Sequence, residues 1–364
     1  MQQPLAHGAF EPAELVAESG LAVTEGRGGP ADASGPHGAV ECAQQCRFEI
    51  GSHNDMLCPL CSGRGFRSFR PIGSVGPMHY FHVDVFSGTP FSGNSLAVFP
   101  GAAGLTGSQM QRITEEMRHF ESIFLDQKNE AGDAWRARVF DLSEELDFAG
   151  HPVIGAASVL HAVAGGDTSR TWSLELKART VEVVTERRGH GRYASVLDQG
   201  PPQFLGRPVL NDLASWFCLD EEDLHAELRP EIVSTGLRYL IVPVRTGALK
   251  RARIRSDIAG PLAQVGAQFG YLLDADALEG RHWNNDGVVE DVATGSAAGC
   301  VAAYLRRHGR LGDGDQQVLR QGQFCGRPSE MTISAHGGPQ DIASVRVGGE
   351  VAVVARGRLE GLPQ

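Results

Sequence analysis

The sequence of 364 residues predicts an α+β protein of two similar domains, each a curved, mostly antiparallel sheet wrapped around a central helix. Three observations favour this fold class. Each half of the chain places one helix of small residues among several strands, a glycine turn begins each of these helices, and their alanine and glycine faces suit close burial inside a curved sheet. We expect the two domains to face each other across a cleft into which both helix N-termini point.

The first domain is expected to span residues 78–203. Its first strands are predicted in "HYFHVDVF", "LAVF", "SIFL" and "AWRARVFDL", with an amphipathic helix in "TGSQMQRITEEMRHF" before the third strand. The central helix is predicted in "FAGHPVIGAASVLHAVAGG", where Pro152 suits the first turn and Gly165 suits the end. The segment "TWSLELKARTVEVVTERRGHGRYASVL" indicates a meander of strands after that helix.

The second domain, expected over residues 204–364, repeats this plan. Strands are predicted in "EIVSTGLRYLIVPV" and "GYLLDAD". The central helix is predicted in "ATGSAAGCVAAYLRRHG", which has basic residues in its last turn and Gly309 as its stop. Three further strands are predicted in "PSEMTISA", "ASVRVGG" and "EVAVVARGRL", the last of which is free to return to the first domain.

Residues 1–77 differ in composition from the rest of the chain. The stretch "GRGGPADASGPHG" is poor in large apolar residues, which is typical of a low-complexity extension and not of a packed core. Four cysteines follow with the pair spacing of a structural zinc site, Cys-x3-Cys and then Cys-x2-Cys: Cys42, Cys46, Cys58 and Cys61. His53 is a spare ligand. The alternative interpretation is a tail of incidental cysteines ahead of Met78, where the globular pattern begins.

The composition argues against several classes of function. The net charge is −11 at pH 7 and no basic stripe is interleaved with aromatic residues, which argues against a nucleic-acid partner. No apolar run approaches the roughly 18 to 20 residues that a membrane helix needs. The N-terminus shows no basic start followed by an apolar core. We therefore expect a cytoplasmic protein whose seven cysteines are mostly reduced.

Candidate acid/base residues lie beside the two predicted helix starts and one strand. Glu121 follows Phe120 directly before a strand, and an apolar setting there would raise the pKa of its carboxyl toward neutrality. His151, next to Gly150, could donate a hydrogen bond to a substrate, and a helix N-terminus would lower its pKa. Asp291 could orient a substrate or share a proton with a second acid. The alternatives are a solvated or capping acid and a structural histidine.

The segment "EDVATGSAAG" allows two interpretations of the second helix start. Thr294 or Ser296 could be an ordinary N-cap. Alternatively, Gly295 lets a ligand carboxylate reach backbone N–H groups at the positive end of the helix dipole. The sequence has no dinucleotide fingerprint, no phosphate loop, no Gly-x-Ser-x-Gly elbow and no lysine in a pyridoxal context, so we expect chemistry without an organic cofactor.

From Met78 to about Gly361 the chain resembles the PhzF-like family, named for phenazine biosynthesis, within the diaminopimelate-epimerase fold. The matching stretches occur in family order: "VDVFSGTPFSGNSLAVF", "MRHFESIFL", "VFDLSEELDFAGHPVIGAA", "VSTGLRYLIVPV", "VVEDVATGSAAG" and "QGQFCGRPSEM". From its first to its last residue, the resemblance covers nearly four fifths of the chain. The resemblance favours the helix start that is open to an anion.

The resemblance implies a homodimeric isomerase of specialised metabolism that moves a proton within a small cyclic carboxylic or amino acid, without a cofactor. It implies Glu121 as the base, together with His151 and Asp291. The substrate-binding residues implied by the motif matches are Asn94, Gly150, Thr294, Gly295 and Ser296.

Racemases and epimerases of the wider fold use two cysteines just before the paired glycine turns. This chain has Ala149 and Ala293 at about those positions, and Cys300 lies inside the predicted helix. A two-thiol epimerase is therefore disfavoured. An epimerase or racemase of an amino or hydroxy acid stays an alternative, as does a non-catalytic small-acid binder or an interaction protein whose N-terminal arm recruits a partner.

Some stretches depart from the family pattern near the expected substrate. The base lies in "RHFE", the glycine–asparagine step continues into Ser95, and the segment before the second acidic motif reads "RHWNNDG". We therefore expect the reaction type to be retained and the substrate to differ. Retention of Glu121, His151 and Asp291 together favours an enzyme, because binding alone does not require a proton acceptor.

Overall fold

The computed structural model describes residues 78–166 and 168–364. The extension of residues 1–77 and its predicted zinc ligands Cys42, Cys46, Cys58 and Cys61 lie outside the described residues. Within the described ranges, no group of three or more His, Cys, Asp or Glu side chains is placed to hold a metal ion. None of the helices in those ranges combines the length and the apolar character needed to cross a membrane.

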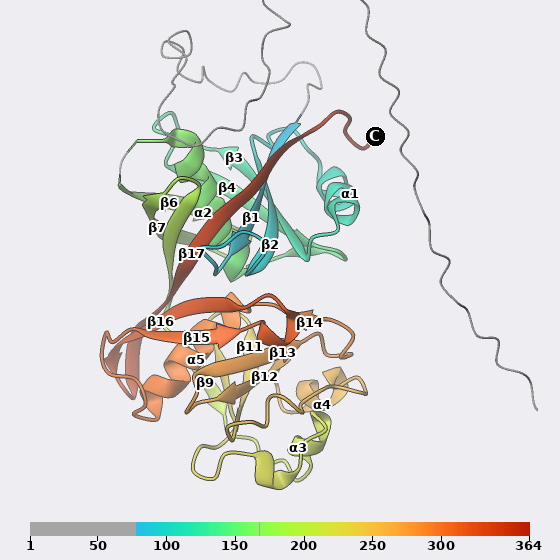
Figure 1. Ribbon diagram of the computed structural model, residues 1–364, viewed down its shortest axis with the longest axis vertical. Helices are drawn as coiled ribbons and strands as arrows, with labels where there is room; N and C mark the ends of the chain where they lie inside the picture. The colour runs from blue at the N-terminus through green and yellow to red at the C-terminus, as the bar shows by residue number, and fades with distance from the viewer. Residues whose placement is uncertain (1–77, 167) are drawn as a thin grey trace, which may run out of the picture. The chain divides into compact units, whose positions relative to one another are not determined.

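The first half of the structure is a ring of strands around one helix (Figure 1). Each strand of the ring hydrogen-bonds to the next, and the last closes on the first. In order they are β1 (Met78–Val85), β2 (Asn94–Pro100), β3 (Glu121–Gln127), β4 (Ala134–Asp141), β6 (Ser169–Glu175), β7 (Thr180–Gly189), β8 (Arg192–Gly200) and β17 (Asp341–Leu359). The β2–β3 and β4–β6 pairs are parallel and the others are antiparallel.

The central helix of this ring is α2 (Gly150–Ala164). Its side chains are buried along nearly the whole length, because valine, isoleucine, alanine and glycine contact the surrounding strands on all sides. The helix ends with Gly165 as its C-cap, as predicted. The short strand β5 (Glu145–Leu146) leads into α2, and α1 (Gly107–Met117) packs against the outer face of the ring.

The second half repeats the order of strand pairings seen in the first, whereas the sequence predicts only that a central helix among strands recurs. Its strands are β10 (Glu231–Ser234), β11 (Arg238–Val244), β12 (Phe269–Asp274), β13 (Glu279–Trp283), β14 (Glu290–Asp291), β15 (Gln317–Gln321) and β16 (Ser329–Gly338). The β11–β12 and β13–β15 pairs are parallel, matching β2–β3 and β4–β6. The central helix is α5 (Gly295–Arg307), followed by Gly309 as predicted. Strand β9 (Gln203–Gly206), which follows β8, pairs with β10.

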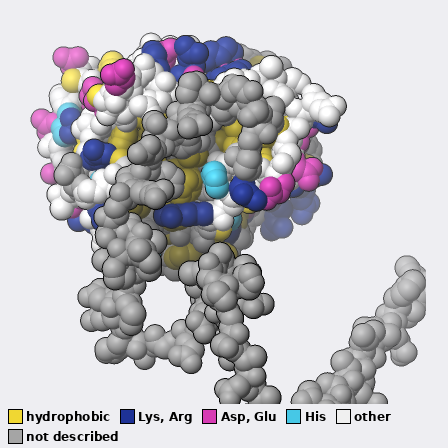
Figure 2. Space-filling view, turned by 90° about the horizontal axis from the view of Figure 1, so that it is seen from above, with side chains coloured by type: hydrophobic (Ala, Val, Ile, Leu, Met, Phe, Trp, Pro, Cys, Tyr) yellow, Lys and Arg dark blue, Asp and Glu magenta, His cyan; other side chains and the backbone are white. Residues whose placement is uncertain are grey.

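Two short helices and two 3-10 turns complete the second half. They are α3 (Leu213–Trp216), α4 (Ala259–Gln264), η1 (Glu221–Asp223) and η2 (Gln323–Cys325). Apolar residues of α3 and α4 pack with outward-facing residues of β10, β11 and β12 in a separate core cluster. Figure 2 shows one face of the molecule, where Lys and Arg side chains and Asp and Glu side chains both occur around hydrophobic ones.

Strand β17 corrects one prediction from the sequence. The stretches "ASVRVGG" and "EVAVVARGRL" were expected to be two strands, but they form one strand that pairs with β16 and β8 and then with β1. The two glycines between them permit close packing and do not end the strand. A Cβ atom on Gly348 would lie 2.7 Å from the Ser195 carbonyl oxygen, and one on Gly349 would lie 2.7 Å from the Phe86 ring.

Because β17 pairs with strands of both halves, it contributes to both rings (Figure 1). Its C-terminal part pairs with β1 from Met78 opposite Leu359 onward. The domain boundary between residues 203 and 204 stays a prediction.

Candidate active site

The N-termini of α2 and α5 meet at a cavity of about 430 Å³. The two helices start in contact, since a Cβ atom on Gly150 would lie 3.2 Å from the Gly295 carbonyl carbon and from the Ser296 nitrogen. Glycine at position 295 is also needed for packing, because a Cβ atom there would lie 3.1 Å from the Phe86 ring. The cavity lining includes most of the predicted site residues: Glu121, Gly150, His151, Asp291, Thr294, Gly295 and Ser296.

Glu121 is the first residue of β3 and its side chain is buried beside the cavity. Its Oε2 atom is buried without a hydrogen-bond partner and lies 3.4 Å from His151 Nδ1, in a geometry that makes no hydrogen bond. Burial raises the pKa of the Glu121 carboxyl well above its ordinary value, and the negative charges of Asp291 and Asp141 raise it further. The apolar setting predicted from the sequence is therefore present.

His151 is the second residue of α2 and is also buried. Burial lowers its pKa to about 4, against the opposing effect of Asp291. A neutral imidazole was predicted from the helix dipole, but removal from water is the main cause. Both pKa shifts favour the uncharged forms, so burial works against an ion pair between His151 and Glu121. The Nε2 atom of His151 is buried without a partner.

Asp291 is held by donors from both halves of the structure. Its Oδ1 atom accepts a hydrogen bond from Asn94 Nδ2 at 3.0 Å, and its Oδ2 atom accepts one from the Thr294 hydroxyl at 2.6 Å. Asn94 also donates to the Ala293 carbonyl oxygen at 3.0 Å. Asn94 is not among the residues that line the cavity, and its amide donates to the Asp291 carboxylate. Its part in substrate binding stays a prediction.

The two helix starts are not capped by side chains. Neither Ala149, the N-cap of α2, nor Thr294, the N-cap of α5, accepts a capping hydrogen bond. The Thr294 hydroxyl donates to Asp291, and the Ser296 hydroxyl lies 2.8 Å from the Tyr239 hydroxyl. The ordinary N-cap interpretation is therefore wrong for both hydroxyls. No side chain of the N-cap residue caps the first-turn N–H groups of either helix, which lie at the positive ends of two helix dipoles.

Several polar residues at the site were missed by the sequence analysis. Tyr239 of β11 and His282 of β13 line the cavity. Gln321, at the end of β15, accepts a hydrogen bond from the Thr294 N–H and donates one to the Asp291 carbonyl oxygen. His282 Nδ1 lies 2.9 Å from the Gly270 carbonyl oxygen, so Nδ1 carries the proton and Nε2 is an acceptor. Burial lowers the His282 pKa and raises that of Tyr239. These residues reach the site through strand register, which no local pattern in the sequence indicates.

Acidic residues of the first half are part of the cavity lining. In addition to Glu121 they are Asp141, Glu144, Glu145 and Asp147. Asp147 forms an ion pair with Lys177 at 2.7 Å and Glu145 forms one with Arg138 at 2.6 Å, so two of these carboxylates already have a basic partner. The cavity thus combines acidic side chains with two helix N-termini, and it suits a ligand that carries both a cationic and an anionic group.

Comparisons with known proteins show the family to which the chain belongs. A family model described as phenazine biosynthesis-like protein matches residues 83–357. A trans-2,3-dihydro-3-hydroxyanthranilate isomerase from Pseudomonas aeruginosa is 35% identical over 291 residues, covering 77% of this chain and 99% of the relative.

Two solved structures extend the comparison. One from Pseudomonas aeruginosa, described as a predicted epimerase, is 45% identical with a TM-score of 0.73 and covers 78% of this chain and 99% of its own. A hydroxyproline epimerase from Agrobacterium vitis is 15% identical with a TM-score of 0.54, over 78% of this chain and 92% of its own, and shares the fold alone. The predicted α+β fold class is confirmed by these likenesses.

Proposed function

Because the chain is an isomerase that belongs to the phenazine biosynthesis-like family, we propose that it moves a proton between two carbons of a small cyclic amino or carboxylic acid, with Glu121 taking and returning the proton. The position of Glu121 carries this proposal. Its carboxyl group borders the cavity, is almost completely buried, and has one oxygen with no hydrogen-bond partner. A buried carboxyl with a raised pKa is a stronger base when ionised, and it can return the same proton to another carbon.

The other residues of the cavity have separate roles in this proposal. The substrate carboxylate binds the first-turn N–H groups of α2 and α5, where two helix dipoles favour negative charge. Neutral His151 hydrogen-bonds a substrate hydroxyl or carbonyl through its unpartnered Nε2. Asp291, held by Asn94 and Thr294, accepts a hydrogen bond from a substrate amine.

The charge of the cavity supports an amino acid as the substrate class. The acidic side chains of the lining attract an ammonium group, and the helix starts attract a carboxylate. The Pseudomonas relative is named for trans-2,3-dihydro-3-hydroxyanthranilate, which makes that compound the first substrate to test. We further propose that the reaction needs no organic cofactor or metal ion, and that the enzyme is a cytoplasmic homodimer of specialised metabolism.

Epimerisation is the second candidate function, because a structure that is 45% identical is described as a predicted epimerase. The two-thiol route lacks its groups in this chain, since Ala149 and Ala293 occupy the positions before the glycine turns. Cys300 lies buried inside α5, and burial raises the pKa of its thiol to about 12, so it holds its proton at neutral pH. An epimerase here would need Glu121 and His151 as its acid and base.

A heavy-water experiment separates the two functions. Wild-type enzyme is incubated with cyclic amino and hydroxy acids in heavy water, and the products are analysed by NMR and mass spectrometry. Proton shift gives a new ring isomer whose migrated hydrogen is partly retained from the substrate, because a buried carboxyl exchanges slowly with solvent. Epimerisation gives the mirror configuration at one carbon with deuterium at that carbon. Turnover by Glu121→Gln within a few-fold of wild type would show that Glu121 is not the proton carrier.

A further inference from the structure

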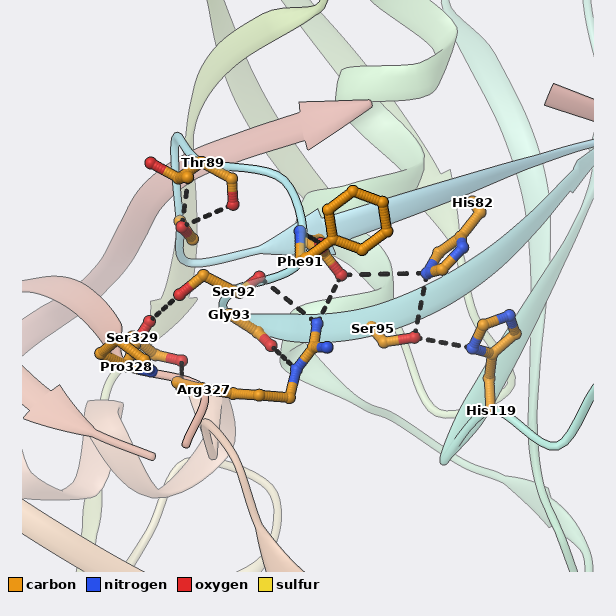
Figure 3. A network of polar contacts seen from close by, with 12 residues as sticks. His82, Thr89, Phe91, Ser92, Gly93, Ser95, His119, Arg327, Pro328 and Ser329 are labelled. Atoms are coloured by element: carbon orange, nitrogen blue, oxygen red, sulfur yellow. Dashed lines mark hydrogen bonds and ion pairs between the residues drawn. The ribbon is translucent and has the colours of Figure 1, made fainter. Parts of the chain in front are cut away.

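The segment "QGQFCGRPSEM" between β15 and β16 has no role in the function proposed above. It contains Arg327, whose side chain reaches from the second half of the structure to the first (Figure 3). Arg327 Nε donates to the Gly93 carbonyl oxygen at 2.8 Å, and its Nη2 donates to Asp84 Oδ1 at 2.7 Å and to the Ser92 carbonyl oxygen at 3.4 Å. One guanidinium therefore holds the loop that ends directly before Asn94.

The backbone of Gly93 has little room to move, so the hydrogen bond from Arg327 to its carbonyl oxygen also constrains Asn94, the next residue. The φ angle of Gly93 is +73°, and a Cβ atom there would lie 2.5 Å from the Val85 carbonyl oxygen, so only glycine fits. Asn94 is the next residue, 3% exposed, and both hydrogens of its amide group are used, one on Asp291 Oδ1 and one on the Ala293 carbonyl oxygen. A shift of the Gly93 carbonyl therefore changes the position of the Asn94 amide.

The same segment also supports Asp291 from the other side. Gln321 is 1% exposed, and its amide nitrogen donates to the Asp291 carbonyl oxygen at 2.9 Å and to the Thr294 hydroxyl at 3.0 Å. Gly322 lies against the residue after Asp291, since a Cβ atom on it would be 2.5 Å from the Val292 carbonyl oxygen. Arg327 N donates to the Gly322 carbonyl oxygen at 3.0 Å, which closes a ring of contacts from Asp291 through Arg327 and Asn94 back to Asp291.

We propose that Arg327 is a positioning residue for the reaction, which by holding the Gly93 carbonyl sets the Asn94 amide and through it the Asp291 carboxylate. This inference rests on the proposed function, in which Asp291 contacts the substrate. Arg327 is outside the cavity lining and contacts neither Glu121 nor His151.

Arg327→Lys is the variant that separates positioning from stability. A lysine keeps the positive charge beside Asp84, whose buried carboxylate would otherwise keep only the hydrogen bond from the Phe91 N–H and lose its charged partner Arg327. Lysine lacks the forked guanidinium that also bonds the Gly93 carbonyl oxygen. We expect kcat to fall about tenfold to a hundredfold, the effect of a misplaced catalytic group, while KM and the melting temperature change little. Arg346→Lys is the matched control, because Arg346 pairs with Asp198 at 3.2 Å between β17 and β8, away from the cavity.

A double-mutant cycle with Asn94→Ala tests the route. If Arg327 acts through Asn94, the double variant Asn94→Ala, Arg327→Lys has a kcat within about threefold of Asn94→Ala alone. If the two substitutions lower kcat independently, so that the fold-losses of the single variants multiply in the double variant, the inference is overturned. An Arg327→Lys variant that raises KM without lowering kcat would overturn it as well.

A second measurement needs no substrate, so it stays informative if the proposed function fails. In protein labelled with ¹⁵N-asparagine, the side-chain amide signals of Asn94 are identified by their loss in Asn94→Ala. We expect them to shift in Arg327→Lys and to stay in place in Arg346→Lys. Unmoved Asn94 signals in Arg327→Lys would refute the positioning role. Absence of wild-type turnover on every acid tested, with shifted Asn94 signals, would refute only the proposed function.

Discussion

Glu121 and His151 are buried beside the same cavity, and burial shifts their pKa values in opposite directions. Removal from water favours the neutral form of each, which raises the pKa of the acid and lowers that of the base. Both side chains also leave a buried polar atom without a partner. Such groups reduce the stability of a folded protein and are therefore concentrated where a ligand supplies the missing partner.

The raised pKa of Glu121 predicts a pH-dependent effect of Glu121→Gln on stability. Above pH 4.5, the ordinary value, the unfolded chain releases the Glu121 proton while the folded protein keeps it. The folded state then binds more protons, so wild-type stability falls as the pH rises, until the folded pKa is passed. Glutamine has no such proton. We expect the stability advantage of Glu121→Gln to grow across this range in denaturant unfolding, with the exposed Glu222→Gln as control; a constant difference would contradict the shift.

Turnover provides a separate prediction for Glu121. Glutamine preserves the size of the side chain and its hydrogen bonding but cannot accept a proton. We expect Glu121→Gln to bind substrate nearly normally while kcat falls by about 10² to 10⁴, the usual share of general acid–base catalysis. Steady-state kinetics with isothermal titration of the substrate would check this. A variant that lost binding but kept kcat would assign Glu121 to binding.

Ser296 and Thr294 are expected to differ, although both are hydroxyl residues at the start of α5. The Ser296 hydroxyl lies in the cavity beside Tyr239, so Ser296→Ala should raise KM about fivefold, the value of one neutral hydrogen bond, with kcat nearly unchanged. The Thr294 hydroxyl donates to Asp291, so Thr294→Val should lower kcat instead. Kinetics of the two variants side by side decide this. A kcat loss of more than about a hundredfold in Ser296→Ala would contradict a binding role.

The sequence predicted the residues that lie near helix starts and missed those that depend on strand register. Glu121, His151 and Asp291 are each next to a glycine turn or a strand start, where an acid or histidine is unusual enough to notice. Tyr239 and His282 are ordinary strand residues in the sequence, and only the pairing of β11, β12 and β13 brings them to the cavity. The support of Asp291 by Asn94 spans 197 residues, a separation that no local pattern reports.

At the scale of elements, the central helices were predictable because their composition leaves few alternatives. Helices made of alanine, glycine and valine on every side must be buried on every side. The strands after them were less well predicted. In the sequence, Gly348 and Gly349 suggest the end of a strand, since glycine usually weakens a strand. In the structure they lie where β17 passes close to Ser195 and Phe86, and a larger side chain would not fit. Strands β13 and β15 were missed because they are short and carry several polar residues.

The contact between the two helix starts predicts an effect of Gly150→Ala. The added Cβ would lie 3.2 Å from backbone atoms of Gly295 and Ser296, which can give way only if α2 and α5 separate slightly. We expect kcat and substrate affinity to fall together while the protein stays folded. Gly260→Ala in α4 is the control, because the space around that glycine is open. Unchanged kinetics in Gly150→Ala would show that the helix starts tolerate separation.

At the scale of the whole molecule, the first ring and the strand pairings of the second half are all made by residues from Met78 onward. We therefore predict that a chain of residues 78–364 folds and keeps its turnover. The measurement is soluble expression, thermal unfolding and kinetics beside the full chain, with zinc analysis of both. Loss of solubility or activity on truncation would show that the extension contributes to the fold.

A shorter fragment should behave differently. Residues 78–203 contain the first ring without β17, so β1 and β8 would each have an unpaired edge and α2 would be partly exposed. We expect this fragment to lack cooperative unfolding, as measured by circular dichroism during heating. Cooperative unfolding of the fragment alone would show that the first half is an independent domain.

The pairing of β1 with β17 also bears on how the protein is made. The first described strand of the chain needs the last one as its neighbour, so the ribosome completes the second half before the first ring can close. During synthesis the growing chain must carry two open strand edges through the translation of more than a hundred residues, which exposes it to pairing with other nascent chains. The last step of folding should therefore wait until the C-terminal strand leaves the ribosome, and the rate at which either half collapses should not limit it. The need for chaperones should last for the same period.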